Sequence, residues 1–198
     1  PRSTLFPYTT LFRSFPFQEY SQNIGMTYDD SSAIQILENR LGHKLDQEAV
    51  FNDFKRRKLA LIDEEPLCPG IIEYLEKGKE IGLKIGLASS AKREWIDYHI
   101  QRKSIENYFD VIFTLEDVHA PKPDPALYIL TVNTFGFQPR EVIAFEDSFN
   151  GIQSAKLAGL VAVAVPNPIT RVFDFSSADL ILDSLSDILL PDLMDKFA

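Results

Sequence analysis

The stretch Val142-Ile143-Ala144-Phe145-Glu146-Asp147-Ser148-Phe149-Asn150-Gly151 runs from apolar residues through two adjacent carboxylates to a serine. A short apolar run bounded by polar residues is typical of a buried strand. Ser148 belongs to the residue types that begin helices, and Gly159 belongs to those that end them. The stretch therefore predicts a strand over 142–145, a polar turn, and a helix over 152–158.

The same alternation of strand and helix extends in both directions through residues 68–198. Strands that alternate with helices form a parallel sheet covered on both faces, so the predicted fold class is α/β with a three-layer parallel sheet. Ligands bind such sheets at the carboxyl ends of the strands. Apolar runs predict further strands over 83–88, 111–114, 160–165 and 180–182. Periodic apolar positions predict a helix that begins at Pro69 and ends at Gly82, and further helices over 92–103 and 126–135.

Residues 15–67 show no strand pattern and predict a small helical unit. One helix is expected to follow Ser31 and to end near Gly42, and a second is expected to follow Asp46. The segment Pro66-Leu67-Cys68-Pro69-Gly70 ends this pattern, because prolines and glycine interrupt helices.

Residues 1–14 have a different character. Thr4-Leu5-Phe6 recurs as Thr10-Leu11-Phe12, and Arg-Ser stands at both ends of residues 2–14. This near-symmetric arrangement predicts a foreign linker, which is set aside before the fold is considered. The alternative is a short edge hairpin with Pro7-Tyr8 in its turn.

The composition argues against several classes of function. The chain of 198 residues has a formal net charge of -9 and a pI near 4.8. Nucleic-acid phosphates are bound by clustered Lys and Arg, which an acidic protein does not offer. The single cysteine, Cys68, excludes an internal disulfide and a multi-cysteine metal site. Apolar runs such as 160–165 are far shorter than a membrane span. We expect a cytoplasmic protein that binds neither nucleic acid nor membrane.

Polar residues follow the predicted strands at the edge where ligands are expected. Ser89 and Ser90 follow the strand over 83–88, where hydroxyls and free N–H groups of the next helix would bind an anion; the alternative is a plain serine helix cap. Lys122 stands in Ala120-Pro121-Lys122-Pro123-Asp124-Pro125, where three prolines restrict the backbone. It is either a positioned functional lysine or a solvated residue of a stiff loop before a helix capped by Asp124.

Glu146 and Asp147 directly follow a predicted buried strand. Adjacent carboxylates repel each other unless a cation holds them, and Mg2+ accepts one or two carboxylates together with water and phosphate oxygens. The pair therefore predicts a Mg2+ site, and the alternative is an aspartate helix cap with a surface glutamate. Hydroxyl groups, a lysine and a carboxylate pair at one edge of one sheet are the groups that phosphoryl transfer requires.

The chain resembles the haloacid dehalogenase (HAD) superfamily in three motifs. The resemblance covers about residues 17–185 and is strongest to the branch that contains beta-phosphoglucomutase and small-molecule phosphatases. It implies a HAD-like Rossmannoid core over 68–198, a partial helical cap over 15–67, a Mg2+ cofactor, a small phosphorylated substrate and a monomer. The motifs resemble HAD motifs II, III and IV in order and spacing, and they are Gly86-Leu87-Ala88-Ser89-Ser90, Lys122-Pro123-Asp124-Pro125 and Phe145-Glu146-Asp147-Ser148-Phe149-Asn150-Gly151.

The resemblance also implies a role for each site residue. Ser89, with Ser90 beside it, would bind a phosphoryl oxygen. Lys122 would bridge the nucleophile and the phosphoryl group, and Glu146 and Asp147 would place Mg2+. The basic residues of the cap, Lys55, Arg56, Arg57 and Lys58, would either touch the substrate or form a solvated helix face.

One family feature is missing from this sequence. HAD enzymes carry an Asp-x-Asp motif on a central strand upstream of the cap, and its two aspartates act as nucleophile and as general acid and base. No aspartate precedes Asp29, and Asp29-Asp30 follows no apolar strand. We therefore expect a phosphohydrolase whose N-terminal sequence is damaged and whose chain, as it stands, is inactive. The alternatives are a sugar-phosphate mutase, a non-catalytic phosphate-binding relative and a dehalogenase, against which the Glu146-Asp147 pair counts.

Overall fold

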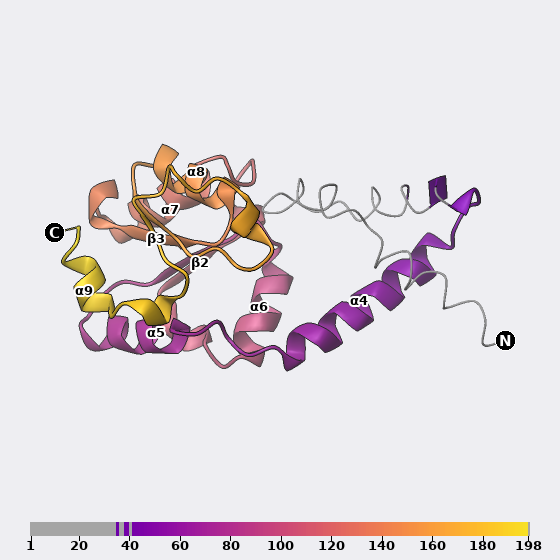
Figure 1. Ribbon diagram of the computed structural model, residues 1–198, viewed down its shortest axis with the longest axis horizontal. Coiled ribbons are helices and arrows are strands. Elements are labelled where there is room, and N and C mark those ends of the chain that lie inside the picture. The colour runs from indigo at the N-terminus through magenta and orange to yellow at the C-terminus, as the bar shows by residue number, and fades with distance from the viewer. Residues whose placement is uncertain (1–34, 36–37, 40, 198) are drawn as a thin grey trace. The chain divides into compact units, whose positions relative to one another are not determined.

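The computed structural model describes residues 35, 38–39 and 41–197, which divide into two compact units. The first unit contains the described residues up to Pro66, and the second begins at Leu67 (Figure 1). The boundary falls inside the segment 66–70 that was expected to end the helical region. The assignment of the first unit as a partial cap stays a prediction.

Helix α4 (Gln47–Glu64) makes up most of the first unit. It begins where the sequence predicts, because the Asp46 carboxylate accepts a hydrogen bond from the backbone N–H of Ala49 at 3.1 Å. A preceding helical segment ends at Gly42, whose φ of 72° is readily adopted by glycine. The predicted start of that segment at Ser31 lies outside the described residues.

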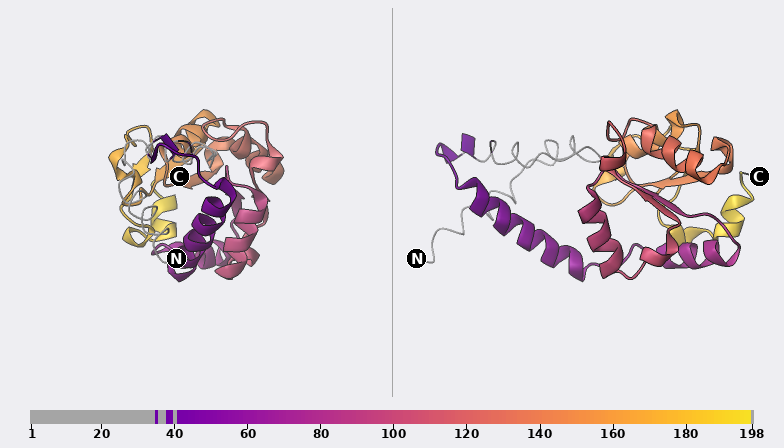
Figure 2. Two further views of the ribbon diagram at one scale, coloured as in Figure 1. Left: turned by 90° about the vertical axis from the view of Figure 1, so that its right-hand side faces the viewer. Right: turned by 180° about the vertical axis from the view of Figure 1, so that it is seen from behind.

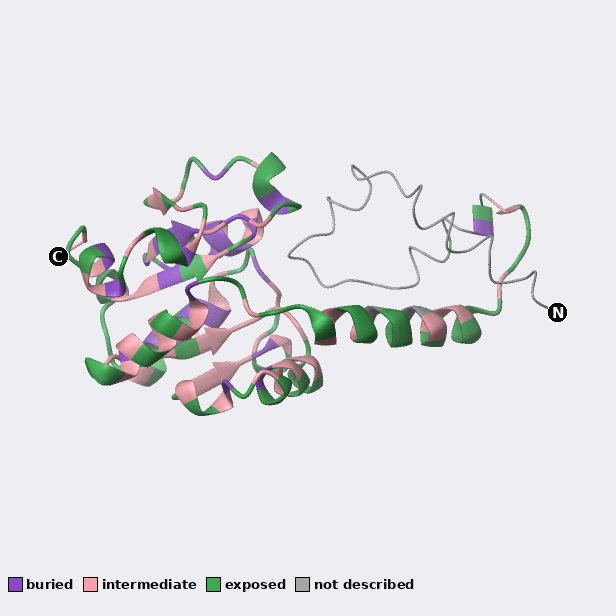
Figure 3. Cartoon of the chain, turned by 60° about the horizontal axis from the view of Figure 1, so that its bottom comes forward, coloured by how far each residue is buried: buried purple, intermediate pink, exposed green. Residues whose placement is uncertain are grey.

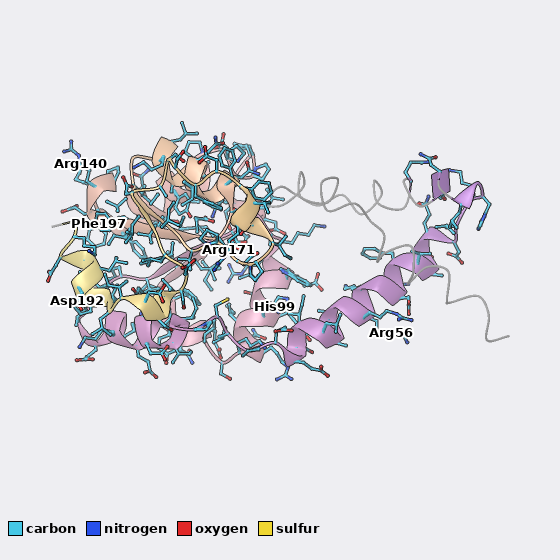
Figure 4. All side chains as sticks on the ribbon, in the orientation of Figure 1. Arg56, His99, Arg140, Arg171, Asp192 and Phe197 are labelled. Carbon is cyan, nitrogen blue, oxygen red and sulfur yellow. The ribbon has the colours of Figure 1, made fainter. Side chains whose placement is uncertain are left out.

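Three basic residues of α4, Lys55, Arg56 and Arg57, are exposed. None of the side chains described in α4 is buried (Figure 3). Arg57 Nε pairs with Asp53 Oδ2 at 2.8 Å, and Arg56 binds the other oxygen of the same carboxylate. Figure 4 shows Arg56 projecting from the helix. The contacts of these two arginines fit a solvated helix face.

Five strands form two parallel ladders in the second unit, with one strand at each predicted position. They are shorter than the apolar runs. The ladder begins at Gly86, for example, because the backbone N–H of Ile85 bonds to the Asp110 carboxylate at 2.9 Å instead of to a strand. The strands are β1 (Gly86–Ala88), β2 (Val111–Phe113), β3 (Ile143–Glu146), β4 (Val161–Ala164) and β5 (Leu180–Ile181).

The strands form two separate ladders. β1 pairs with β2 and aligns Gly86 with Val111, while β4 lies between β3 and β5. In the part of the chain that the structure describes, no strand joins β1 to β3. The break falls in the middle of the sheet, where the HAD resemblance puts the strand that carries Asp-x-Asp.

Helices cover both faces of the strands, which confirms the three-layer α/β prediction. Helix α7 (Ala126–Phe135) packs on β1 and β2, and α8 (Phe149–Leu157) packs on β3 and β4. Helices α5 (Ile71–Glu80) and α9 (Leu190–Met194) contact each other on the opposite face (Figures 1 and 2). The remaining elements are α6 (Arg93–Arg102) and the 3-10 turns η1 (Glu106–Tyr108), η2 (Leu115–Asp117), η3 (Pro139–Glu141), η4 (Thr170–Val172) and η5 (Leu185–Asp187).

Helices α5 and α8 begin at other residues than expected, and α6 begins one residue later than expected, at Arg93. Helix α5 begins after Gly70 and not at Pro69, because Gly70 turns the chain with a φ of 87°. A Cβ at Gly70 would lie 2.6 Å from the backbone of Leu185, so only glycine fits. Helix α8 begins at Phe149 and not at Ile152, because the Ser148 hydroxyl accepts the N–H of Gly151 at 3.0 Å. Helix α9 was not predicted.

Small apolar side chains form the core between α8 and the strands. Ala155 and Ile152 on α8 are fully buried, as is Ala162 on β4. Alanines at the contact allow a helix to approach the strands closely, which produces dense packing. On the other face, the Tyr74 ring of α5 packs edge-on against Phe145 of β3, with ring centroids 5.6 Å apart. No helix among the described residues is long and apolar enough to cross a membrane.

Candidate active site

Lys122 lies at the centre of a polar site at the carboxyl ends of the strands. Although it stands in a loop, only 7% of the residue is exposed. Its Nζ donates a hydrogen bond at 2.9 Å to the carbonyl oxygen of Ala88, the last residue of β1. The same ammonium group forms an ion pair with Glu146, the last residue of β3. One buried cation therefore bridges the ends of the two ladders.

Tyr128, near the start of α7, completes the surroundings of this lysine. Its hydroxyl accepts a hydrogen bond from Lys122 Nζ at 3.2 Å and donates one to Glu146. The ammonium also lies 4.5 Å from the centroid of the Tyr128 ring, a cation–π contact. Burial, and then the negative charge of Glu146, raise the pKa of the Tyr128 phenol well above its usual value. The phenol therefore stays protonated and keeps its donor toward Glu146.

The Glu146 carboxylate lies directly against Gly151, in the first turn of α8. Its side chain is 9% exposed, and a Cβ at Gly151 would lie 1.9 Å from Oε2. Only glycine leaves room for the carboxylate in this position. A buried ion pair contributes little more stability than apolar side chains of the same size. The buried Lys122–Glu146 pair is therefore better explained by function than by stability.

Ser89 and Ser90 directly follow Ala88, whose carbonyl oxygen binds Lys122 Nζ, and both serine hydroxyl oxygens accept hydrogen bonds from backbone N–H groups. Ser89 Oγ accepts from Ala91 N at 3.1 Å, and Ser90 Oγ accepts from Lys122 N at 2.9 Å. Ser89 makes a local turn and does not cap a helix, because α6 starts later, after Lys92. A hydroxyl that accepts a hydrogen bond keeps its own proton, so both serines can still donate to an anion.

Asp147 is exposed, in contrast to Glu146. Its Oδ2 accepts a hydrogen bond from Asn167 Nδ2 at 2.9 Å. The two residues are brought together by the pairing of β3 with β4, which continues through Val165 N bonding to Glu146 O at 2.7 Å. Asp147 therefore presents a carboxylate at the surface of the site with one oxygen fixed.

The described residues match the predicted Mg2+ site only in part. The cation that holds Glu146 is the Lys122 ammonium, which removes the repulsion argument for a metal at that carboxylate. Asp147 remains as an exposed oxygen ligand of the kind that Mg2+ combines with water and phosphate oxygens. The described part of the chain contains no cluster of three or more potential His, Cys, Asp or Glu ligands. Asp147 thus fits Mg2+ as a single protein ligand, and this role stays a prediction.

The predicted site residues lie at one edge of the sheet, and two further residues were missed. Ser90, Lys122 and Glu146 are linked by direct contacts, Ser89 is adjacent to them, and Asp147 faces Asn167 instead. Tyr128 was missed because it reads as an apolar position of a helix. Asn167 was missed because asparagine between two prolines reads as an ordinary turn. The catalytic and binding roles of all these residues stay predictions.

Comparisons with known proteins give the family. YhcW of Bacillus subtilis (strain 168) is 38% identical over 161 residues, which are 81% of this chain and 73% of that protein. Hexitol phosphatase B of Escherichia coli (strain K12) is 31% identical over 140 residues, 70% of this chain and 63% of that protein. The crystal structure of CbbY from Rhodobacter sphaeroides in complex with phosphate is similar with a TM-score of 0.67 and 26% identity, covering 86% of this chain and 79% of that chain.

These relatives are longer than the region that matches, since it spans 63% to 79% of the three proteins. The family model for haloacid dehalogenase-like hydrolases matches residues 7–165 of this chain. That range begins inside residues 1–14, whose foreign origin stays a prediction. Because the match covers more than half of the chain and joins the same three motifs, this chain belongs to the haloacid dehalogenase-like hydrolases.

Proposed function

We propose that this chain carries the phosphate-binding and metal-binding side of a HAD-type phosphatase site for a small phosphorylated metabolite. The observation that carries the proposal is the buried Lys122 ammonium, which binds the carbonyl oxygen of Ala88, the residue directly before Ser89 and Ser90, at the carboxyl end of β1. Fixed positive charge and hydroxyl donors in a site shielded from water stabilise a phosphoryl group and the charge that develops on it.

Each residue then has a distinct task. The Ser89 hydroxyl donates a hydrogen bond to a phosphoryl oxygen, and the Lys122 ammonium neutralises phosphoryl charge. Ser90 fixes the Lys122 backbone through the 2.9 Å bond from Lys122 N. Asp147 holds Mg2+, which when bound supplies further charge neutralisation and orients the phosphoryl group. The contacts of Glu146 favour a role through Lys122 over the direct Mg2+ contact that the resemblance implies.

The relatives support the substrate class. One relative is named hexitol phosphatase B, and CbbY from Rhodobacter sphaeroides was crystallised with phosphate and with xylulose-(1,5)bisphosphate. We infer a phosphorylated carbohydrate or a metabolite of similar size as the ligand, bound by a monomer in the cytoplasm. A phosphatase and a sugar-phosphate mutase share this core, so the mutase remains the alternative enzyme.

The sequence also favours a second candidate, a non-catalytic phosphate-binding protein. No aspartate precedes Asp29, so residues 1–28 offer no aspartate nucleophile that could form an aspartyl-phosphate. We expect the chain to bind phosphate without hydrolysing phosphate esters. Release of p-nitrophenol from p-nitrophenyl phosphate tests this expectation. Turnover by the wild-type chain that is lost in Ser89→Ala or Lys122→Met would refute it.

The binding proposal is tested by titrating inorganic phosphate into the chain with Mg2+ present and measuring the heat. We expect the wild type to bind and Lys122→Met to lose binding. Ser89→Ala should weaken binding by about tenfold, the loss of one hydrogen bond to a charged group. Lys84→Met is the matched control, because Lys84 is an exposed lysine at the opposite, amino end of β1 that pairs with Asp110. A wild type that does not bind phosphate, or equal losses in the two lysine variants, would overturn the proposal.

A further inference from the structure

We propose that Asn167 is a positioning residue that holds Asp147 in the orientation that binds a divalent cation. The inference rests on the proposed function, because it requires Asp147 to be the ligand. Asn167 lies in the loop after β4, and its Nδ2 donates to Asp147 Oδ2 at 2.9 Å.

The contacts of the Asn167 side chain determine which end of the amide faces Asp147. Its Oδ1 accepts hydrogen bonds from the backbone N–H groups of Ile169 at 2.8 Å and Thr170 at 3.1 Å. Both partners are donors only, so the atom that faces them must be the amide oxygen. The NH₂ group then necessarily points to Asp147. The amide therefore acts as a fixed donor whose orientation is set by the loop itself.

The loop that carries Asn167 is anchored in turn by a buried threonine. Thr170 is 1% exposed, and its Oγ1 accepts the backbone N–H of Asn167 at 3.0 Å. Thr170 begins the turn η4, in which Arg171, labelled in Figure 4, pairs with Asp183 at 3.2 Å. The β3–β4 pairing sets the start of the loop and Thr170 sets its continuation, so the amide has little freedom to leave Asp147.

The two adjacent carboxylates, Glu146 and Asp147, have partners of different charge. Glu146 is paired with a cation, the Lys122 ammonium, whereas Asp147 receives a hydrogen bond from a neutral amide. A neutral donor fixes a carboxylate without cancelling its charge, so Asp147 keeps the negative charge that a metal ion needs. Carboxylates that bind metal ions are commonly hydrogen-bonded in this way, and loss of such a partner typically lowers metal affinity about 10–100-fold.

The test uses Mn2+ as a probe for the Mg2+ site and measures free Mn2+ by electron paramagnetic resonance. We expect Asn167→Ala to weaken Mn2+ binding at least about 10-fold relative to the wild type. Asn167→Ser should give the same loss with the loop preserved, because a serine hydroxyl can accept the N–H groups of the turn but does not carry the amide donor. Asp147→Asn should abolish binding.

Val172→Ala is the matched control, because Val172 is an exposed residue of the same turn η4 and its truncation leaves the contacts of Asn167 and Thr170 in place. We expect its Mn2+ affinity to stay close to that of the wild type. Wild-type affinity in Asn167→Ser, or equal losses in Asn167→Ser and Val172→Ala, would overturn this inference and leave the proposed function intact. A wild-type chain that binds no Mn2+, or an Asp147→Asn variant that binds it normally, would overturn the inference together with the metal site. Phosphate titration would still test the remaining part of the function.

Discussion

Replacement of Gly151 by alanine should destabilise the protein, although alanine favours helices. Gly151 lies in the first turn of α8, where its added Cβ would lie 1.9 Å from Oε2 and 2.1 Å from Cδ of Glu146. No small adjustment accommodates a methyl group at these distances. The Glu146 carboxylate would have to move, and it is held by Lys122 and by the Tyr128 hydroxyl.

The expected magnitude follows from two opposing terms. Alanine stabilises a helix interior by about 1 kcal/mol relative to glycine. If the Glu146 carboxylate moves away, the Lys122 ammonium stays buried without its partner, and an uncompensated buried charge costs about 3–5 kcal/mol. We therefore expect Gly151→Ala to lower the free energy of unfolding by about 2–4 kcal/mol, the difference between these two terms.

Urea denaturation monitored by circular dichroism measures this change, with the midpoint reporting stability if the slope stays constant. Gly78→Ala in α5 is the control, since its Cβ would meet the flexible end of Ile85 at 3.1 Å, and it should change stability by no more than about 1 kcal/mol. Introduced into a Glu146→Ala background, Gly151→Ala should become neutral or stabilising, because the clash is gone. If Gly151→Ala costs the same with and without Glu146, the carboxylate is not the obstacle and the reasoning is wrong.

Three further predictions concern buried or paired charges in the second unit. Lys122→Met should lower the free energy of unfolding by about 3–5 kcal/mol, because the buried charge of Glu146 is left without a partner. The double variant Lys122→Met with Glu146→Gln should recover most of this loss, as measured by urea denaturation. The pKa of Tyr128 is raised, so the stability that its protonated hydroxyl confers is fully present below about pH 10 and is lost as the pH rises further. Tyr128→Phe should therefore flatten the fall of the unfolding free energy at alkaline pH. An unchanged fall would contradict this prediction. The backbone N–H of Ile85 and then Lys79 lower the pKa of Asp110 to about 2. The stability that the ionised Asp110 confers should therefore be present above about pH 4 and be lost as the pH falls toward the lowered pKa of Asp110. The difference in unfolding free energy between wild type and Asp110→Asn should shrink over this pH range, as measured by acid unfolding.

The order of strands and helices in the second unit could be predicted because local signals suffice for it. Apolar runs of strand length alternate with helical patterns, and Gly82 and Gly159 mark helix ends with positive φ values. The strand lengths could not be predicted, because a ladder ends where a backbone N–H bonds to a side chain instead of to the neighbouring strand. At Ile85 that side chain is the Asp110 carboxylate, which is distant in the sequence.

The candidate site was predictable in position but not in its contacts. Prolines around Lys122 and carboxylates after β3 indicated functional strand ends. The sequence did not reveal that the cation beside Glu146 is a lysine, because this depends on how the loop before α7 crosses the strand ends. Tyr128 and Asn167 enter the site only through tertiary proximity, the first through packing of α7 on β1 and the second through pairing of β4 with β3.

The division of the described sheet into two ladders has a consequence for local unfolding. Each ladder consists of strands that are consecutive in the chain and has its own covering helix, α7 for β1 and β2 and α8 for β3 and β4. Units built from such neighbouring segments commonly open separately, and their amides then exchange with solvent at different rates. The Lys122–Glu146 pair joins the carboxyl ends of the two ladders. An opening motion between the ladders would expose this pair to water, so Lys122, which is proposed to bind phosphate, would also report the motion through its hydration.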